Sequence, residues 1–182
     1  IMSGRDWNLR SRAERNRLRD ELKADIRFTD EVAGERLHFA TTWGLFSPRR
    51  IDDGTRLLLD HVEVGPEDRC LDLGCGYGPI GLVFARKAVR GQCTLVDKDF
   101  VAVEYSRRNA ELNGIRNVDC LLSNGFDQIS ERRFDVMASN LPAKVGRELL
   151  YTYLLDAWEQ LNPGGRLYVV TITGLRRFIE KG

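Results

Sequence analysis

The sequence predicts one α/β domain built on a doubly wound, mostly parallel sheet, with an N-terminal helix and β-hairpin extension. Strand-like apolar segments alternate with helical ones over most of the chain, which is typical of βαβ units. A glycine-rich loop stands directly after the first strand of this alternation and directly before a helix. The length of 182 residues allows one sizeable core but not two ordinary domains.

Residues 1–45 are predicted to form an appendage, and residues 46–182 to form the main domain. The stretch 9–26 is charged and rich in helix formers, and Leu18 and Leu22 lie four positions apart, so we expect a surface helix with a narrow apolar stripe. Basic residues outnumber acidic ones between residues 5 and 27, and RNA docking and an ordinary solvated helix both explain that bias. The elements expected next are strands at 27–32 and 36–41 with a turn at 33–35, an aromatic loop at 43–48 and a helix at 51–62.

The main domain is predicted from the hydrophobic period of the remaining chain. Gly114 follows a long helical pattern as a C-cap does, and Asn162-Pro163-Gly164-Gly165 interrupts the chain before the last predicted strand. The expected strands are 69–73, 94–97, 118–122, 134–139 and 166–173, and the expected helices are 80–87, 100–113 and 144–161.

The glycine loop Asp72-Leu73-Gly74-Cys75-Gly76-Tyr77-Gly78 is the first candidate site. Residues without a Cβ let the backbone turn tightly and approach a ligand, although a purely structural turn is the alternative. The dinucleotide fingerprint G-x-G-x-x-G fails because Pro79 stands at its third glycine position. The acidic-x-G-x-G-x-G spacing resembles instead the loop of proteins that bind S-adenosylmethionine (SAM), a cofactor without a pyrophosphate.

Two further positions are expected to complete the cofactor site. Asp97 closes the second strand about 20 positions after Gly76, where a carboxylate can accept hydrogen bonds from both ribose hydroxyls. A turn formed with Lys98 is the alternative explanation for Asp97. Asn124 follows the third strand, at a place from which it reaches an adenine, or it is a turn residue before Gly125. The residues expected around the cofactor after the glycine loop are therefore Asp97, Lys98, Asn124 and Gly125.

From about Phe46 to its end the chain resembles the methyltransferase small domain family of class I SAM-dependent methyltransferases. That family includes bacterial 16S ribosomal RNA guanine-N2 methyltransferases and small archaeal relatives. The resemblance implies a Rossmann-like, seven-stranded, mostly parallel sheet, so we expect the domain at 46–182 to be truncated at its C-terminus. The matching segments are Gly44-Leu45-Phe46-Ser47, Asp53-Gly54-Thr55, Leu71 to Gly81, Asp97, and Asn109 to Gly114.

The resemblance also implies a catalytic motif, Asn/Asp-Pro-Pro-aromatic, where this sequence reads Asn140-Leu141-Pro142-Ala143. In the family, the Asn oxygen and the next carbonyl accept hydrogen bonds from a planar exocyclic amine and orient its lone pair toward the methyl group. Methyl transfer depends on such positioning more than on base catalysis. We therefore expect Asn140, Leu141 and Pro142 to be catalytic, with Asn140 also beside the cofactor. An Asn that only satisfies loop backbone groups is the alternative.

Ala143 departs from the family pattern, because an aromatic residue at this place stacks on the target base. Either another aromatic side chain stacks on the base, or the substrate is not a nucleobase. Trp43, Phe46 and Tyr151 are the candidates, although core or lid roles for Trp43 and Phe46 are equally compatible with the sequence. Lys144 and Arg147 are candidate phosphate contacts, and a solvated helix face is their alternative explanation.

The first functional hypothesis is SAM-dependent methyl transfer to an exocyclic amine of a nucleobase in ribosomal or transfer RNA, guanine N2 being favoured. The second keeps SAM and changes the acceptor to a small molecule or protein side chain, because of Ala143 and a net charge of only +1. The third is a catalytically silent SAM-binding or RNA-assembly module.

The composition also limits cofactors and compartment. Four cysteines without a C-x-x-C pair, together with two histidines, give no expectation of a metal site. No apolar run has the length of a membrane span, and the first residues lack the apolar stretch of a signal peptide. We therefore expect a cytoplasmic protein whose partner is RNA rather than a membrane.

Overall fold

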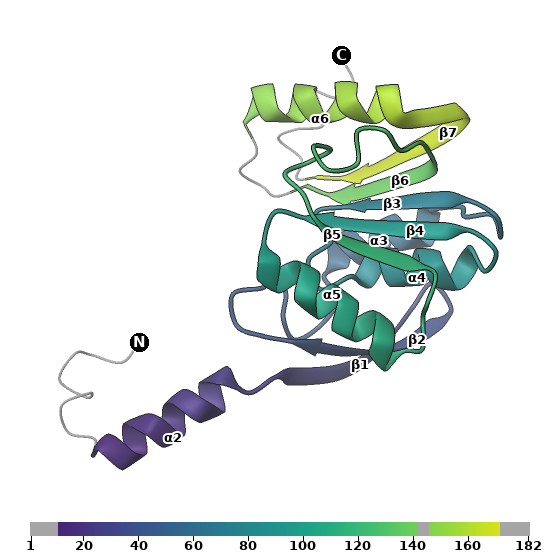
Figure 1. Ribbon diagram of the computed structural model, residues 1–182. Coiled ribbons are helices and arrows are strands. Elements are labelled where there is room, and N and C mark those ends of the chain that lie inside the picture. Colours follow the sequence, from purple (N-terminus) through teal and green to yellow (C-terminus); the bar gives the residue numbers. More distant parts are fainter. Residues whose placement is uncertain (1–10, 142–145, 172–182) are drawn as a thin grey trace.

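The computed structural model describes residues 11–141 and 146–171, which form a five-stranded sheet with helices on both faces (Figure 1). The elements are α2 (Arg12–Lys23), β1 (Ile26–Val32), β2 (Glu35–Thr41), α3 (Asp53–His61), β3 (Arg69–Leu73), α4 (Pro79–Lys87), β4 (Gln92–Asp97), α5 (Phe100–Leu112), β5 (Val118–Leu122), β6 (Phe134–Asn140), α6 (Arg147–Gln160) and β7 (Leu161–Val170). The predicted fold class, including the N-terminal helix and hairpin, is confirmed. Among the described residues, no helix combines the length and apolar character needed to cross a membrane.

The sheet has the strand order β5-β4-β3-β6-β7, and every neighbouring pair is parallel. From β3 the chain winds outward through β4 to β5, then returns to the other side of β3 for β6 and β7. The direction of winding therefore reverses between β3 and β6. In open parallel sheets a crevice forms at such a switch point, beyond the carboxyl ends of the two strands, and ligands bind there.

Two apolar clusters fill the two sides of the sheet. The larger one joins the sheet to the hairpin and to helices α3, α4 and α5, whereas the smaller one lies on the opposite face, where α6 packs. Strand β3 shows the alternation that this arrangement demands, since Cys70 belongs to the larger cluster and Leu71 to the smaller one. Figure 1 shows α6 on the face of the sheet opposite α4 and α5.

Gly81 brings helix α4 close against the sheet. A Cβ atom at this position would lie 2.4 Å from Cγ of Leu95, well inside van der Waals contact. Because the glycine has no side chain, the start of α4 can lie directly over β4. The glycine loop that precedes the helix is thereby held at the edge of the switch point.

The hairpin β1–β2 is confirmed, and it packs into the domain rather than beside it. Ala33 and Gly34 take positive φ angles of 51° and 81° at its turn, as a two-residue hairpin connection requires. Phe39 is buried and stacks on Phe28 with ring centroids 5.2 Å apart. The boundary predicted at residue 45, between the appendage and the main domain, therefore lies between the hairpin and a domain with which the hairpin shares one hydrophobic core. Helix α2 extends away from the rest of the domain, and none of its residues is buried (Figure 1).

Two asparagines of α5 hold the hairpin through hydrogen bonds to the backbone of β2. Asn109 Oδ1 accepts from the N–H of Ala40 at 2.7 Å, and its Nδ2 donates to the carbonyls of Ala40 at 3.0 Å and Tyr77 at 2.9 Å. Asn113 makes the same pair of bonds with His38, at 2.8 and 2.7 Å. The two side-chain amides thus satisfy backbone N–H and carbonyl groups of β2, as the backbone of a neighbouring strand would.

We expect Asn109→Ala to lower the free energy of unfolding by about 2–4 kcal/mol, because each buried backbone group left unpaired costs about 1–3 kcal/mol. Urea denaturation of the purified protein measures the change. Asn16→Ala serves as the control, since Asn16 is exposed on α2 and its replacement should shift stability by less than about 0.5 kcal/mol. A loss below about 1 kcal/mol for Asn109→Ala would contradict this role.

The last strand differs from its prediction, which placed Asn162–Gly165 before the strand. Strand β7 already begins at Leu161, opposite Phe134, and the ladder resumes with Arg166 opposite Val136. The residues between them form a bulge, with Gly164 at φ 79°. A hydrogen bond of 2.7 Å from Asn162 Nδ2 to Asp135 Oδ1 anchors that bulge. The other predicted elements are confirmed to within a few residues, except where their ends lie outside the described residues.

Candidate functional site

The glycine loop follows β3 with three residues at positive φ, namely Gly74 at 76°, Gly76 at 56° and Gly78 at 92°. The N–H groups of Gly74 and Cys75 both donate to the carbonyl of Val96, at 2.8 and 2.9 Å. A Cβ added at Gly74 or Gly76 would meet no described atom within 4 Å. The backbone of the loop therefore borders open space that a ligand can enter closely.

Asp97, at the end of β4, bonds directly to this loop. Its Oδ2 accepts from the N–H of Gly76 at 2.9 Å, and its Oδ1 accepts from the N–H of Asp99 at 2.9 Å. Each carboxylate oxygen has two acceptor sites, so both oxygens retain capacity for a ligand donor. Asp97 thus both stabilises the turn after β4, through Asp99, and lies beside the glycine loop, through Gly76. Lys98 follows as an exposed residue.

Asp72 lies beneath the loop with 1% of its surface exposed. Its Oδ2 accepts from the N–H of Gly81 at 2.7 Å, which fixes the start of α4. Its Oδ1 is buried and has no hydrogen-bond partner among the described residues. Burial raises the pKa of Asp72 to about 7, and the charge of Asp97 acts in the same direction, while the bond from Gly81 opposes them.

This raised pKa predicts a pH dependence of stability. The folded-state pKa of about 7 lies above the ordinary value of 3.8, so the folded protein holds a proton that the unfolded chain releases. The contribution of Asp72 to stability is therefore greatest below about pH 4 and is lost as the pH rises to about 7. Asp72→Asn keeps an oxygen for Gly81 and has no charge to bury. We expect the variant to gain a few kcal/mol relative to wild type between pH 4.5 and 7.5.

Urea unfolding of both proteins at several pH values across that window measures the difference. The gap between the two stability curves should widen steadily toward neutral pH. Parallel curves would contradict the raised pKa of Asp72.

Asn140 ends β6 on the other side of the switch point from the glycine loop. The preceding residue, Ser139, donates from Oγ to the carbonyl of Leu73 at 2.7 Å, so the ends of β3 and β6 are in direct contact. The Asn140 Nδ2 donates to Asp52 Oδ2 at 2.9 Å and to Thr55 Oγ1 at 3.0 Å. The recorded bonds of this amide thus join it to side chains and not to loop backbone.

The rest of the predicted motif is only partly described. The N–H of Leu141 donates to the carbonyl of Val170 at 3.0 Å, and its side chain is buried. Pro142, like Lys144, lies outside the described residues. The bond to Val170 holds the backbone that follows Asn140 against β7.

The partners of Asn140 come from the start of α3. Asp52 is the N-cap of this helix, and its Oδ1 accepts from the N–H groups of Gly54 at 2.9 Å and Thr55 at 3.3 Å. Its Oδ2 accepts from Thr55 Oγ1 at 2.6 Å. The sequence places Asp52 only within the start of the helix expected at 51–62, and the spacing from Asp52 to Thr55 is the local signal of the capping geometry. The contact of Asp52 and Thr55 with Asn140 joins distant segments of the chain, so no local sequence pattern predicts it.

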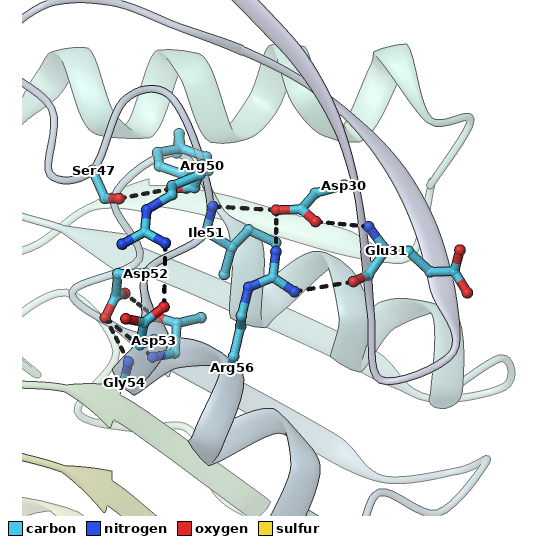
Figure 2. A network of polar contacts seen from close by, with 11 residues as sticks. Asp30, Glu31, Ser47, Arg50, Ile51, Asp52, Asp53, Gly54 and Arg56 are labelled. Carbon is cyan, nitrogen blue, oxygen red and sulfur yellow. Dashed lines mark hydrogen bonds and ion pairs between the residues drawn. The ribbon is translucent and has the colours of Figure 1, made fainter.

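A second network joins the hairpin to the same helix start (Figure 2). Asp30 of β1 forms an ion pair with Arg56 and accepts from the N–H of Ile51 at 3.4 Å. Arg56 Nη1 also donates to the carbonyl of Glu31 at 3.1 Å. Burial alone would raise the pKa of Asp30, but the hydrogen bond and charge of Arg56 hold it below its ordinary value. The end of α3 that carries Asp52 is therefore fixed by the hairpin.

The predicted base platforms lie in the loop between β2 and α3. Trp43 is 48% exposed and Phe46 is 69% exposed. The guanidinium carbon of Arg49 lies 4.7 Å from the centroid of a Trp43 ring. Tyr77 Oη donates to the carbonyl of Arg50 at 3.1 Å, which ties this loop to the glycine loop. Both aromatic side chains are thus available at the surface on a loop connected to the site.

The remaining candidates occupy different surroundings. The ring of Tyr77 faces the hairpin, 5.4 Å from Phe39, so only its backbone remains for a cofactor. Asn124 is exposed and donates from Nδ2 to Asp127 at 3.3 Å. Gly125, at φ 59°, is covered by Tyr153, a residue that sequence analysis did not select; a Cβ on this glycine would lie 2.8 Å from that ring.

Two candidates belong to α6. Tyr151 is 46% exposed on this helix, and Arg147 is its first residue. Within the described part of the chain, no group of three or more His, Cys, Asp or Glu residues is arranged to hold a metal ion.

A parallel sheet with a glycine loop after its first strand and a carboxylate at the end of the next defines a Rossmann-like domain with a nucleoside-type cofactor site. The chain belongs to the methyltransferase small domain family, whose model matches residues 36–178. The match begins within β2, so it includes the inner hairpin strand, the glycine loop and Asn140.

Similar proteins agree with this family. An uncharacterized protein of Bacillus subtilis strain 168, YbxB, is 37% identical over 134 residues, which cover 72% of this chain and 67% of that protein. Ribosomal RNA small subunit methyltransferase C of Stutzerimonas stutzeri strain A1501 is 33% identical over 153 residues, covering 82% of this chain and 46% of the relative. The present chain thus spans less than half the length of that methyltransferase.

A solved structure supports the same fold. The Thermus thermophilus 16S rRNA N2 G1207 methyltransferase, RsmC, in complex with AdoMet and guanosine, superimposes with a TM-score of 0.76 and 26% identity. The match covers 86% of this chain and 45% of that one.

Proposed function

We propose that this chain is a SAM-dependent methyltransferase that modifies an exocyclic amine of a nucleobase in ribosomal or transfer RNA, guanine N2 being favoured. The observation that carries the proposal is the position of Asn140, which ends β6 at the switch point where the Ser139–Leu73 hydrogen bond joins it to the glycine-loop strand. The methyltransferase C relatives and RsmC support the substrate class, because their names specify ribosomal RNA and N2 of a guanine.

The loop residues fit SAM as the cofactor. The open space over Gly74 and Gly76 leaves room for a ligand against bare backbone, and Asp97 retains acceptor sites for ribose hydroxyls. The Oδ1 atom of Asp72, which has no hydrogen-bond partner among the described residues, lies buried beneath the same loop. Asn124 and Gly125 follow β5 and would border the adenine. SAM supplies a methyl group made electrophilic by a sulfonium sulfur.

The amine would be held by acceptors at the end of β6. Asn140 Oδ1 and the Leu141 carbonyl would accept its two N–H groups and direct the nitrogen lone pair toward the methyl group, and a proline after Leu141 favours an extended conformation of that residue. Holding two reactants in line in this way accounts for a large part of the rate of a bimolecular transfer. The chain needs no strong base for this step.

RNA contacts would come from the surroundings of the site. Trp43 and Phe46 offer exposed rings, and stacking on a base contributes about 1–3 kcal/mol. Tyr151 is a third candidate ring, and Lys144 and Arg147 are candidate phosphate contacts. A cytoplasmic location accords with an RNA substrate of this kind.

Incubation with methyl-labelled SAM and total RNA from a strain lacking the gene tests the proposal. We expect label in ribosomal or transfer RNA, and N2-methylguanosine after digestion to nucleosides. Label confined to a protein or metabolite fraction would favour the second hypothesis. SAM binding without label in any fraction would favour the silent module.

A further inference from the structure

We propose that Asp52 and Thr55 are positioning residues that fix the side-chain amide of Asn140 with its NH₂ end toward α3 and its oxygen toward the switch point. This inference rests on the proposed function, since it concerns how the same site presents an acceptor to an amine. Nothing in the family resemblance assigns a role to the contact between α3 and Asn140.

The orientation of the Asn140 amide follows from the chemistry of its partners. An amide has one end that only donates and one that only accepts, and the two ends have nearly the same shape. Asp52 Oδ2, 2.9 Å away, is a carboxylate oxygen and can only accept. The amide end that faces it must therefore be the NH₂ group.

Thr55 completes the arrangement. Its single hydroxyl proton is directed to Asp52 Oδ2 at 2.6 Å, so its oxygen faces Asn140 as an acceptor, 3.0 Å from Nδ2. The two acceptors lie 2.6 Å apart and both face Nδ2, so together they hold the NH₂ end of the Asn140 amide against α3. The Asn140 oxygen is the end left for a substrate. A flipped amide would place that oxygen against a carboxylate, which is electrostatically unfavourable.

The charge of Asp52 is not needed for its capping role. Its Oδ1 satisfies the N–H groups of Gly54 and Thr55, and a neutral Asn caps a helix about as well as Asp. The second carboxylate oxygen is directed instead at Thr55 and Asn140. A hydrogen bond from the amide NH₂ to a carboxylate also polarises the amide and strengthens its oxygen as an acceptor.

Orientation matters because an exocyclic amine presents N–H donors. Asn140 accepts such a donor only through its oxygen, whereas its NH₂ end would repel it. The Asp52–Thr55 pair therefore selects a donor substrate over a ring nitrogen or a carboxylate. The same geometry holds Asn140 in one rotamer before substrate binds.

Asp52→Asn tests the inference with little change in shape. The new side chain keeps an oxygen for the cap, but its NH₂ group faces the Asn140 NH₂ group, so the Asn140 amide should flip. We expect kcat with RNA to fall about 10- to 100-fold, with SAM affinity within about twofold and the thermal midpoint within about 3 °C of wild type.

Asp53→Asn is the matched control. Asp53 is the next residue along the same helix start, has an 81% exposed side chain and pairs with Arg50 at 3.4 Å. It carries the same charge near the same helix terminus but has no recorded bond to Asn140. We expect its kcat to stay within about twofold of wild type. An equal loss of kcat in both variants would overturn the inference in favour of a general charge effect.

A second pair of variants separates positioning from folding. Thr55→Val removes the hydroxyl from a buried side chain, and Thr55→Ser retains it. We expect Thr55→Val to lower kcat about tenfold and Thr55→Ser to restore it to within about threefold, at similar SAM affinity. A Ser variant as slow as the Val variant would show that the hydroxyl is not the operative group.

Side-chain amide NMR of the SAM-bound protein tests the inference without any substrate. We expect the Asn140 NH₂ signals, assigned by loss in Asn140→Ala, to exchange slowly in wild type and to shift and exchange faster in Asp52→Asn but not in Asp53→Asn. Unchanged signals in Asp52→Asn would overturn the inference. Absence of RNA methylation by wild type would instead defeat the proposed function, leaving the NMR result to decide the orientation of Asn140.

Discussion

An Asn140→Ala variant should transfer methyl groups to RNA at least about 100-fold more slowly than wild type, because removing one oriented hydrogen-bonding group from a catalytic site costs about 10²–10³ in rate. The alanine leaves Asp52 and Thr55 in place but presents no acceptor for the amine. The glycine loop and Asp97 do not bond to the Asn140 side chain in the structure. We therefore expect SAM affinity to stay within about threefold of wild type.

Single-turnover transfer from labelled SAM measures the chemical step, and calorimetry measures SAM binding. Asn162→Ala is the control, since Asn162 bonds to Asp135 within the bulge at the start of β7, at the opposite end of the parallel strands from the site. It should retain the wild-type rate to within about twofold. Wild-type turnover by Asn140→Ala would remove Asn140 from the catalytic site and with it the main support for an amine substrate.

The parts of the site that the sequence predicts well are those with a local cause. The glycine loop and Pro79 specify a turn into a helix by their own backbone preferences, and the structure has both features there. Asn140 is a candidate because the family resemblance implies a short catalytic motif directly after a clear strand, and its catalytic role stays a prediction. The alternation of strands and helices likewise needs only the hydrophobic pattern along the chain.

The parts that the sequence does not predict depend on contacts between distant segments. Asp52 and Asn140 are 88 positions apart, and the capping role of Asp52 already accounts for an acidic residue at that place. Asn109 matches the family pattern, but its reason is a pair of bonds to Ala40, 69 positions away. The sequence predicts an interruption before the last strand where the structure has a bulge within β7, because Pro and Gly residues occur in bulges as well as in loops.

Asp97→Ala should weaken SAM binding by about 10- to 100-fold, because hydrogen bonds to a charged acceptor contribute about 1.5–3 kcal/mol. The substitution removes the carboxylate expected to accept the ribose hydroxyls and also frees the N–H of Gly76, which Asp97 now accepts at 2.9 Å. Both effects act on the same loop. Titration calorimetry with SAM measures the dissociation constant directly.

Two further variants, Asp97→Asn and Asp99→Asn, separate the effect of the Asp97 charge from its support of Gly76. Asp97→Asn keeps an oxygen for Gly76 but loses the charge, so we expect a smaller weakening, about 3- to 10-fold. Asp99→Asn changes the next acidic residue, which caps α5 through the N–H of Val101, and because Asn caps equally well SAM affinity should not change. If Asp97→Ala binds SAM as tightly as wild type, the ribose lies elsewhere and the cofactor cannot occupy the loop in the orientation proposed. If Asp97→Asn weakens binding as much as Asp97→Ala, the charge rather than the support of Gly76 accounts for the affinity.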